Sequence, residues 1–180
     1  MPEAPVSASD SVKWTSLDEL LATVASEVGL PPLAMPVTAL AHSGAYRTII
    51  PWLSSPSLKH VALLDALYAG VAQFMSWAAQ LGHSLDIVVT PTGAPRSNAE
   101  AAMPSIAGMV ARRTSLPLDS QALGAKVLYL LSPLSHFALV EPATSLIPVL
   151  LRDRAPSTRS GVGAVIAIAL AAFALWLSRR

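Results

Sequence analysis

Leu85-Asp86-Ile87-Val88-Val89-Thr90 (LDIVVT) is the strongest strand signal in this chain of 180 residues. Its β-branched residues favour an extended backbone, and Pro91 ends the run because proline has no amide hydrogen for a strand ladder. Side chains alternate along a strand, so Ile87 and Val89 are predicted to face one way and Val88 the other.

Shorter apolar pieces on both sides of this strand predict further strands. Downstream, they lie at 126–131, 137–140 and 146–151, and Ser132-Pro133 separates the first two. The turn-rich segment 92–105 is predicted to be a loop. Upstream, residues 33–53 break into short pieces around three turn residues, Pro36, Gly44 and Pro51.

Residues 58–81 are ambiguous between helix and strand. Apolar residues recur there at roughly helical spacing, which slightly favours a helix: Val61, Leu64, Tyr68, Val71, Met75 and Leu81. The chain also contains 15 prolines, which are hard to reconcile with long helices because each removes a backbone donor. Short strands punctuated by proline predict a mainly β chain, a β-sandwich or barrel-like domain.

One amphipathic helix is predicted at about residues 17–28. Ser16 can cap it, and Glu19 completes a capping box three residues later. The apolar positions repeat at helical spacing: Leu17, Leu20, Leu21, Val24 and Val28. Gly29 and Pro31-Pro32 end the pattern.

The C-terminal segment contains sixteen consecutive residues without charge or proline, Val162 to Leu177. A helix through it is about 25 Å long at 1.5 Å per residue, slightly short of a bilayer core of about 30 Å. Arginines flank it, so a transmembrane anchor is expected, and a buried core helix is the alternative. The expected anchor residues are Val162, Ile166, Ile168, Leu170, Phe173, Leu175, Trp176 and Leu177.

Composition bounds the remaining possibilities. Hydrophobic residues make up 53% of the chain and charged residues 13%, so there are enough apolar side chains to form a core. The net charge of +1 gives no electrostatic reason to bind nucleic acid. Without cysteine, disulfides and thiolate chemistry are excluded. Residues 1–10 lack the features of a signal peptide, so the main body is expected in the cytosol. The expected organisation is a disordered arm (1–13), one domain (14–152), a linker (153–160) and an anchor (161–180).

No catalytic constellation stands out. The four histidines, His42, His60, His83 and His136, are isolated in sequence, and no HExxH motif or metal-binding carboxylate pair is present. His83 and Asp86 are three residues apart, a spacing that could bring the two side chains together on a helix. In an extended segment they only flank a strand. No serine lies in a GxSxG elbow. The sequence therefore predicts no catalytic residue, no cofactor, no metal and no enzymatic activity.

The middle of the chain resembles the coat proteins of tymoviruses and their relatives. Two stretches carry the resemblance: Lys59-His60 at the start of a strand, and a downstream set in which a Pro-Leu-acidic step precedes a lysine and a Tyr-Leu-x-Ser-Pro turn. The downstream residues are Pro117, Leu118, Asp119, Lys126, Tyr129, Leu130, Ser132 and Pro133. The similarity covers roughly residues 30–152, with gaps.

The resemblance implies a single eight-stranded jelly roll that assembles into a shell around RNA. It also implies that residues 58–81 form a short helix leading into a strand. The C-terminal tail departs from the family. Taken together, the expectation is a mainly β protein: one jelly-roll β-sandwich with an N-terminal amphipathic helix and a C-terminal transmembrane helix. This protein is expected to act as a viral structural protein in a virion or the host cytoplasm, attached to an internal membrane. Its expected partners are itself, viral RNA and the membrane.

Two other functions stay open from sequence alone. A tail-anchored helical viral regulator of the Bcl-2 kind fits the helix at 17–28 and the periodicity of 58–81. The prolines, however, oppose the long helices that such a bundle needs. The other is a small membrane-anchored movement or replication accessory protein, which no motif favours or opposes.

Overall fold

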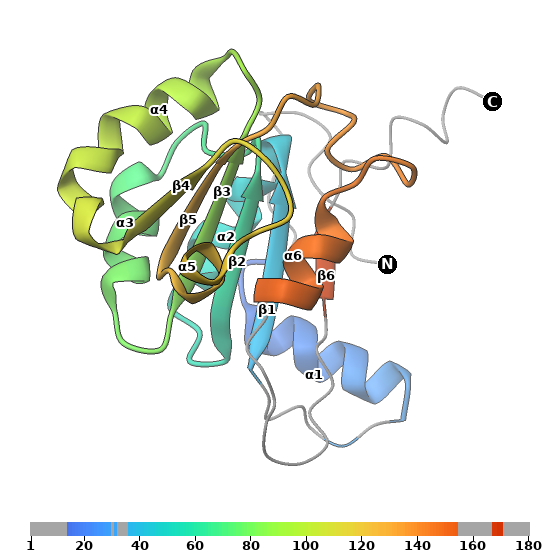
Figure 1. Cartoon of the computed structure of the whole chain (residues 1–180). Helices are drawn as coiled ribbons and strands as arrows, with labels where there is room; N and C mark the ends of the chain where they lie inside the picture. Colours follow the sequence, from blue (N-terminus) through green and yellow to red (C-terminus); the bar gives the residue numbers. More distant parts are fainter. Residues whose placement is uncertain (1–13, 30, 32–35, 155–166, 171–180) are drawn as a thin grey trace.

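A parallel β-sheet with helices on both faces forms the centre of the protein (Figure 1). The structure is a computed structural model that describes residues 14–29, 31, 36–154 and 167–170. In chain order the elements are α1 (Leu17–Glu27), β1 (Val37–His42), η1 (Ser43–Ala45), α2 (Tyr46–Trp52), β2 (Leu58–Leu64), α3 (Val71–Ala79), β3 (Ser84–Val89), α4 (Ala94–Ala102), η2 (Met103–Met109), β4 (Val110–Arg113), α5 (Ser120–Gly124), β5 (Val127–Leu131), α6 (Ile147–Arg154) and β6 (Ala167–Leu170).

The strand order is β4-β5-β3-β2-β1-β6, and every neighbouring pair is parallel. β1 to β5 form an α/β unit of the doubly wound, Rossmann-like kind, and β6 adds to the edge of β1. Parallel neighbours need long crossovers, which the helices between the strands supply.

Two hydrophobic cores fill the two faces of the sheet. On one face, side chains of β1, β2, β3 and β5 pack against α1, α2, α3 and α4. On the other face, the alternate side chains of the same strands pack with β4 and α5 and with the segment that leads into α6. Ile87 and Val89 belong to the first core and Val88 to the second, so the predicted alternation in this strand is confirmed.

The predicted N-terminal helix is confirmed as α1. The Ser16 side chain accepts a hydrogen bond from the Glu19 backbone N–H at 3.2 Å, which satisfies one of the donors left unpaired in the first turn. Leu17, Leu20 and Leu21 are buried against the sheet. The strand expected at 126–131 is also confirmed, as β5.

The jelly-roll expectation is wrong, and with it the tymovirus coat resemblance and the coat function, because a jelly roll is built of antiparallel strands and every pairing here is parallel. The all-helical regulator is excluded by the same sheet. Segment 137–140 forms turns, and 146–151 lies largely in α6. The predicted loop at 92–105 contains α4. Residues 58–81 form a strand followed by a helix, the reverse of the expected order.

The membrane anchor is also corrected. Within the part of the chain that the structure describes, no helix is long and apolar enough to cross a membrane. Ile168 and Leu170 lie in β6, which pairs in parallel with β1, Ala39 opposite Ile168 and Ala41 opposite Leu170. The remaining expected anchor residues lie outside the described residues, as do the arm at 1–13 and most of the linker. Association with itself, with RNA or with a membrane stays a prediction.

Candidate active site

The carboxyl ends of the parallel strands form the edge where ligands bind in sheets of this kind. β3 leads into α4 on one face of the sheet, whereas β5 leads toward α6 on the other face. β3 and β5 are neighbours, so the chain leaves the sheet in opposite directions between them. In open sheets of this kind, ligands bind beside such a point. The polar side chains described next follow β1, β2, β3 and β5 in the chain.

Ser43 stands at a sharp turn between β1 and the helical segment η1–α2. Its φ of 55° lies in the left-handed region, which costs a non-glycine residue free energy. A serine on a strained strand-to-helix turn is the arrangement of the nucleophile elbow in α/β hydrolases, where the turn presents the hydroxyl at the sheet edge. Alanine stands at both positions where the GxSxG motif has glycine, and Ala41 and Ala45 are both buried.

Asp65 directly follows β2 and is the other non-glycine residue with positive φ, 47°, in the described part of the chain. Its Oδ2 lies 2.6 Å from Nδ1 of His136, which is on the segment after β5. Asp65 is 4% exposed, and the His136 side chain is 27% exposed. The two residues are 71 positions apart in sequence, so the sheet alone brings them together.

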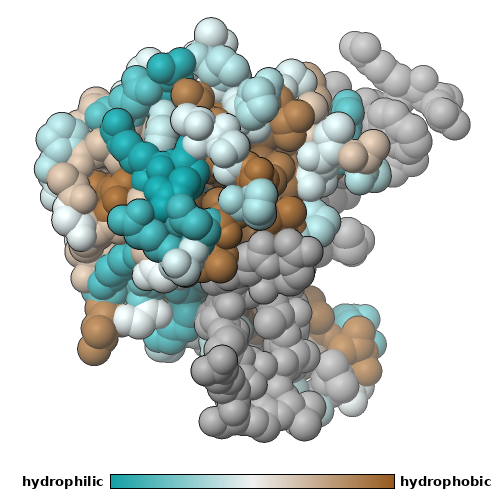
Figure 2. Space-filling view, in the orientation of Figure 1, coloured by the Kyte–Doolittle hydropathy of each residue, from teal (hydrophilic) through white to brown (hydrophobic). Residues whose placement is uncertain are grey.

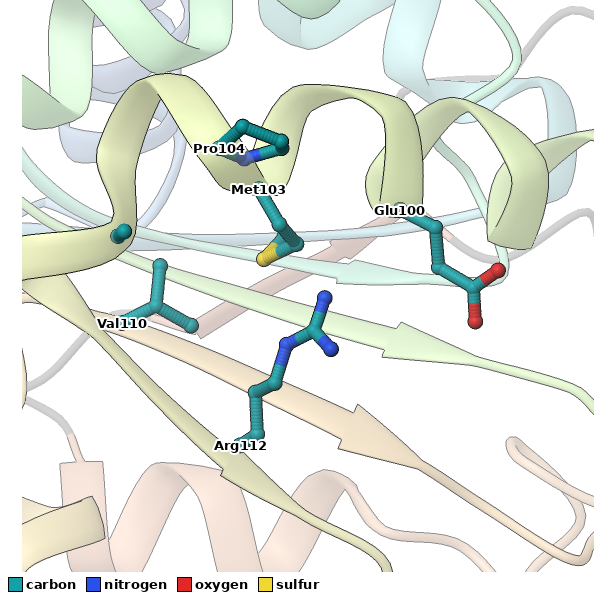
Figure 3. A pocket seen from close by; sticks show the side chains of 6 residues that line it. Glu100, Met103, Pro104, Val110 and Arg112 are labelled. Carbon is teal, nitrogen blue, oxygen red and sulfur yellow. The ribbon is translucent and has the colours of Figure 1, made fainter.

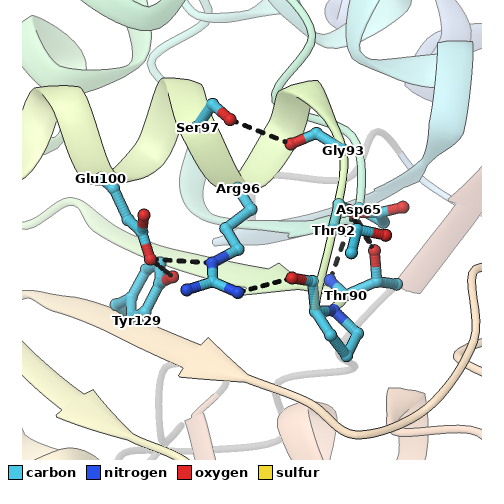
Figure 4. A network of polar contacts seen from close by, with 9 residues as sticks. Asp65, Thr90, Thr92, Gly93, Arg96, Ser97, Glu100 and Tyr129 are labelled. Carbon is cyan, nitrogen blue, oxygen red and sulfur yellow. Dashed lines mark hydrogen bonds and ion pairs between the residues drawn. The ribbon is translucent and has the colours of Figure 1, made fainter.

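Thr90, at the end of β3, holds the other carboxylate oxygen of Asp65 (Figure 4). Its backbone N–H and its hydroxyl donate to Oδ1 at 3.3 and 3.2 Å. Burial alone raises the pKa of Asp65, but the hydrogen bonds from His136 and Thr90 outweigh it and hold this pKa below its usual value. An ionised carboxylate only accepts hydrogen bonds, so Nδ1 of His136 carries the hydrogen. Nε2 is then the ring atom that can accept a proton.

His42 contacts His136 and directly precedes Ser43 in the chain. Its ring lies 4.3 Å from the His136 ring, centroid to centroid, and its Nε2 donates to the His136 carbonyl oxygen at 2.9 Å. Burial is the main reason why the pKa of His42 lies below its usual value, so the ring is neutral near pH 7. Ser43 is the next residue, so His136 contacts the residue that directly precedes the elbow serine.

A second network lies on α4 and is separate from the elbow. Figure 4 shows the Arg96 side chain reaching Glu100, which also accepts from the Tyr129 hydroxyl at 3.3 Å. Arg96 also donates to the carbonyl oxygen of Pro91. This network ties the start of α4 to the end of β3 and to β5.

A cavity of about 340 Å³ lies between α4, η2 and β4 (Figure 3). Met103, Pro104 and Val110 give it an apolar wall, and the Arg112 guanidinium lies 5.3 Å from the centre of the Tyr129 ring. Its charged residues are Glu100, which is engaged by Arg96 and Tyr129, and Arg112. The cavity is separate from the histidine–carboxylate pair at the strand ends.

Hydrophilic residues gather over the β4–α5 side of the molecule, whereas hydrophobic residues gather beside them toward α6 (Figure 2). On the hydrophilic side Arg113 forms an ion pair with Asp119 at 2.6 Å, and Asp119 also caps α5 by accepting from the Ala122 N–H. Hydrogen bonding by Arg113 is the main reason why the pKa of Asp119 is lowered. This surface pair has a structural role.

The sheet interior contains a different histidine–carboxylate pair from the one considered in sequence. His60 on β2 and Asp86 on β3 are both fully buried, with Nε2 and Oδ2 2.9 Å apart. His83 instead stacks on Trp77 and contacts its carbonyl oxygen through Nδ1 at 3.0 Å. The pair of His83 and Asp86 therefore does not form.

The residues of the coat-like motif are scattered over the sheet. Lys59 and His60 lie in β2, and Tyr129 and Leu130 lie in β5. Pro117, Leu118 and Asp119 precede α5, Lys126 precedes β5, and Ser132 and Pro133 follow it. Lys126 donates to the carbonyl of Ala79 at 2.8 Å. None of them belongs to the group formed by Ser43, Asp65 and His136.

Sequence reasoning missed Ser43 because it required the glycines of GxSxG, and it missed the pair of Asp65 and His136 because the two are 71 positions apart. A usable signal was present: the largely apolar stretch 37–41 is followed by His42, Ser43 and Gly44, and a helical segment comes next. In the described ranges, no group of three or more metal-ligating side chains occurs.

Comparison with known proteins adds no family. No family model, no curated protein and no solved structure matches this chain. Its function therefore has to be inferred from the geometry of its own residues.

Proposed function

We propose that this chain is a serine hydrolase that cleaves esters or related acyl compounds, with Ser43 as nucleophile, His136 as general base and Asp65 as the carboxylate that orients the histidine. The observation that carries the proposal is the 2.6 Å contact between Asp65 Oδ2 and His136 Nδ1, together with the packing of His136 on His42, the residue before the strained Ser43. Serine, acid and histidine follow one another along the chain, as in α/β hydrolases.

The chemistry follows from these positions. Ser43 Oγ attacks the carbonyl carbon while its proton moves to Nε2 of His136, and the carbonyl electron pair moves to the oxygen. Asp65 keeps the hydrogen on Nδ1 and stabilises the imidazolium that forms. His136 then gives the proton to the leaving group, and water, activated by the same ring, releases the acyl group from Ser43.

The Gly44 backbone N–H supplies one donor for the oxyanion, because it follows the nucleophile at the start of a helical segment. Positive φ at both Ser43 and Asp65 supports a catalytic role, since strained non-glycine residues cluster at functional sites.

The test is active-site labelling combined with turnover. The purified full chain should hydrolyse p-nitrophenyl acetate or butyrate and should react with a fluorophosphonate probe at Ser43, identified by peptide mass spectrometry. Ser43→Ala should abolish both signals. Ser135→Ala is the matched control because Ser135 is exposed and adjacent to His136, and it should keep both.

Wild-type protein with neither turnover nor labelling, or labelling that survives Ser43→Ala, would contradict the proposal. The expectation from sequence that the chain is not an enzyme stays a prediction, and this assay decides between the two.

A further inference from the structure

The cavity between α4, η2 and β4 combines an apolar interior with one cationic side (Figure 3). Met103, Pro104 and Ala107 line it from η2, and Val110 and Arg112 line it from β4. Its volume of about 340 Å³ lies at the lower end of the range for small-molecule sites in proteins. The cavity therefore has the size for a small ligand with an apolar body.

Strand alternation places Arg112 on the cavity side of the sheet. It lies opposite Tyr129 in the register of β4 and β5, and its guanidinium is 5.3 Å from the centre of the Tyr129 ring. Tyr129 is buried, so this contact holds the guanidinium against a fixed surface. The adjacent Arg113 lies on the other face, where it pairs with Asp119. The Arg112 side chain instead points toward Met103 across the cavity (Figure 3).

The Arg112 guanidinium has donors available for a ligand. Within the part of the chain that the structure describes, its side chain forms no hydrogen bond or ion pair. A guanidinium carries five N–H donors, and contact with the face of a ring does not use them. An anion that enters the cavity can therefore accept from it.

Glu100, the other charged residue of the cavity, is already engaged. It accepts from Arg96 at 2.9 Å and from the Tyr129 hydroxyl at 3.3 Å. The hydrogen bond from Arg96 is the main reason why the pKa of Glu100 lies below its usual value, so this carboxylate is ionised and Arg96 balances its charge. Two guanidinium groups and one carboxylate thus lie on this side of the cavity, and one positive charge remains.

We propose that this cavity binds a small monocarboxylate with an apolar body, such as a short fatty acid. The carboxylate pairs with Arg112, whose planar donors match its two oxygens. The hydrocarbon part packs on Met103, Pro104 and Val110, and the flexible methionine adapts to the shape of the ligand. One remaining positive charge matches one negative charge, so a phosphate dianion is a poorer ligand. The inference does not depend on the hydrolase function, because the cavity is separate from the proposed active site.

Isothermal titration calorimetry of the full chain with hexanoate is the test. Hexanoate should bind at one site per chain. Acetate lacks the apolar body and 1-hexanol lacks the charge, so each should bind at least about tenfold more weakly than hexanoate. Inorganic phosphate should bind no more tightly than acetate.

Variants locate the bound hexanoate. Arg112→Gln should weaken binding by about 10- to 100-fold, the effect of losing hydrogen bonds to a charged group. Arg113→Gln is the matched control, because it removes the same charge from the adjacent residue on the other face of the sheet. Ala107→Phe should weaken binding because its ring fills the cavity, whereas Ala101→Phe, at an exposed position of α4 outside the cavity, should not. Thermal unfolding should show that all four variants are folded.

Three results would overturn the inference. The first is a folded wild-type chain that does not bind hexanoate. The second is binding that either Arg112→Gln or Ala107→Phe leaves unchanged, because hexanoate then lies elsewhere. The third is phosphate bound as tightly as hexanoate, which would mean a general anion site that does not recognise the apolar body. None of these results bears on the proposed hydrolase, whose test is labelling at Ser43.

Discussion

Asp65 is buried, has a strained backbone conformation and forms hydrogen bonds through both carboxylate oxygens. One oxygen accepts from Thr90 and the other from His136. The carboxylate therefore orients the His136 ring and joins the ends of two strands.

Asp65→Asn should lower kcat by about 10⁴-fold, the effect of losing the correct histidine tautomer in a serine–histidine–aspartate triad. An amide has nearly the same shape, so the fold should be retained. Steady-state kinetics with p-nitrophenyl butyrate, together with circular dichroism, measures both effects. Asp119→Asn is the matched control, because Asp119 caps α5 at the surface, and its kcat should remain near wild type. Equal activity of both variants would contradict the role of Asp65.

The stability of the protein should fall on mild acidification because of His42. The unfolded chain takes up a proton on this ring near pH 6.5, whereas the folded protein does so only at lower pH. The unfolded state therefore binds more protons in between, and the free energy of unfolding decreases as pH drops from about 6.5. The stabilisation by Asp65 acts at lower pH: it is present above its usual pKa of 3.8 and is lost as pH falls through the lowered value.

Urea unfolding at several pH values between 7 and 5 tests the His42 effect. His42→Gln keeps a donor for the His136 carbonyl but does not titrate, so its unfolding free energy should depend less on pH in this range. An identical pH dependence in wild type and variant would show that His42 is not the responsible group.

At the scale of the elements, both faces of the sheet are buried, and this explains why the jelly-roll prediction was wrong. Strands of a parallel sheet are apolar on both sides, so they show continuous apolar runs and little alternation. Leu58 to Leu64 has that pattern, and its helical spacing came from residues that fall in two different elements. Periodicity alone does not separate such a strand from a buried helix.

Prolines misled the prediction because their positions matter more than their number. Pro95 lies in the first turn of α4 and Pro104 in the first turn of η2, where an amide hydrogen has no partner in the helix. Pro51 lies near the end of the short helix α2. The capping pattern at Ser16 was reliable, because a cap depends only on residues adjacent in sequence.

The buried pair of His60 and Asp86 should contribute to the stability of the central strands. His60→Leu removes the hydrogen bond to a fully buried carboxylate, which should cost about 3 kcal/mol or more in the free energy of unfolding. The double variant His60→Leu/Asp86→Leu should recover part of this loss. Urea denaturation measures both values.

His83→Leu is the control for the same substitution near the surface, and it should cost less than His60→Leu. If His60→Leu were as stable as wild type, the buried pair would have no stabilising role.

At the scale of the whole molecule, the proposed site is assembled from residues 43, 65 and 136, which follow β1, β2 and β5. Each is unremarkable within its own stretch of sequence. Only the strand order makes them neighbours, and that order depends on long-range pairing that local patterns do not encode. The individual strand at 85–90 and the helix at 17–28 could be predicted, whereas their parallel arrangement and the site could not.

The pairing of β6 with β1 connects the C-terminal region to the strand that carries the elbow. Successive N–H groups of a strand point to opposite sides, and β6 has β1 on one side only, so one of two adjacent N–H groups must face β1. Changing both Ile168 and Ala169 to proline therefore removes at least one donor directed at β1. The expected loss is about 1–3 kcal/mol in the free energy of unfolding, measured by urea denaturation of the full chain.

Ile168→Val/Ala169→Val is the matched control, because valine keeps the N–H and favours a strand, so its stability should be near wild type. Turnover by Ser43 should be more sensitive to heat in the proline variant, since β1 leads directly into the elbow. A proline variant as stable as the valine variant would show that β6 does not pair with β1 in solution.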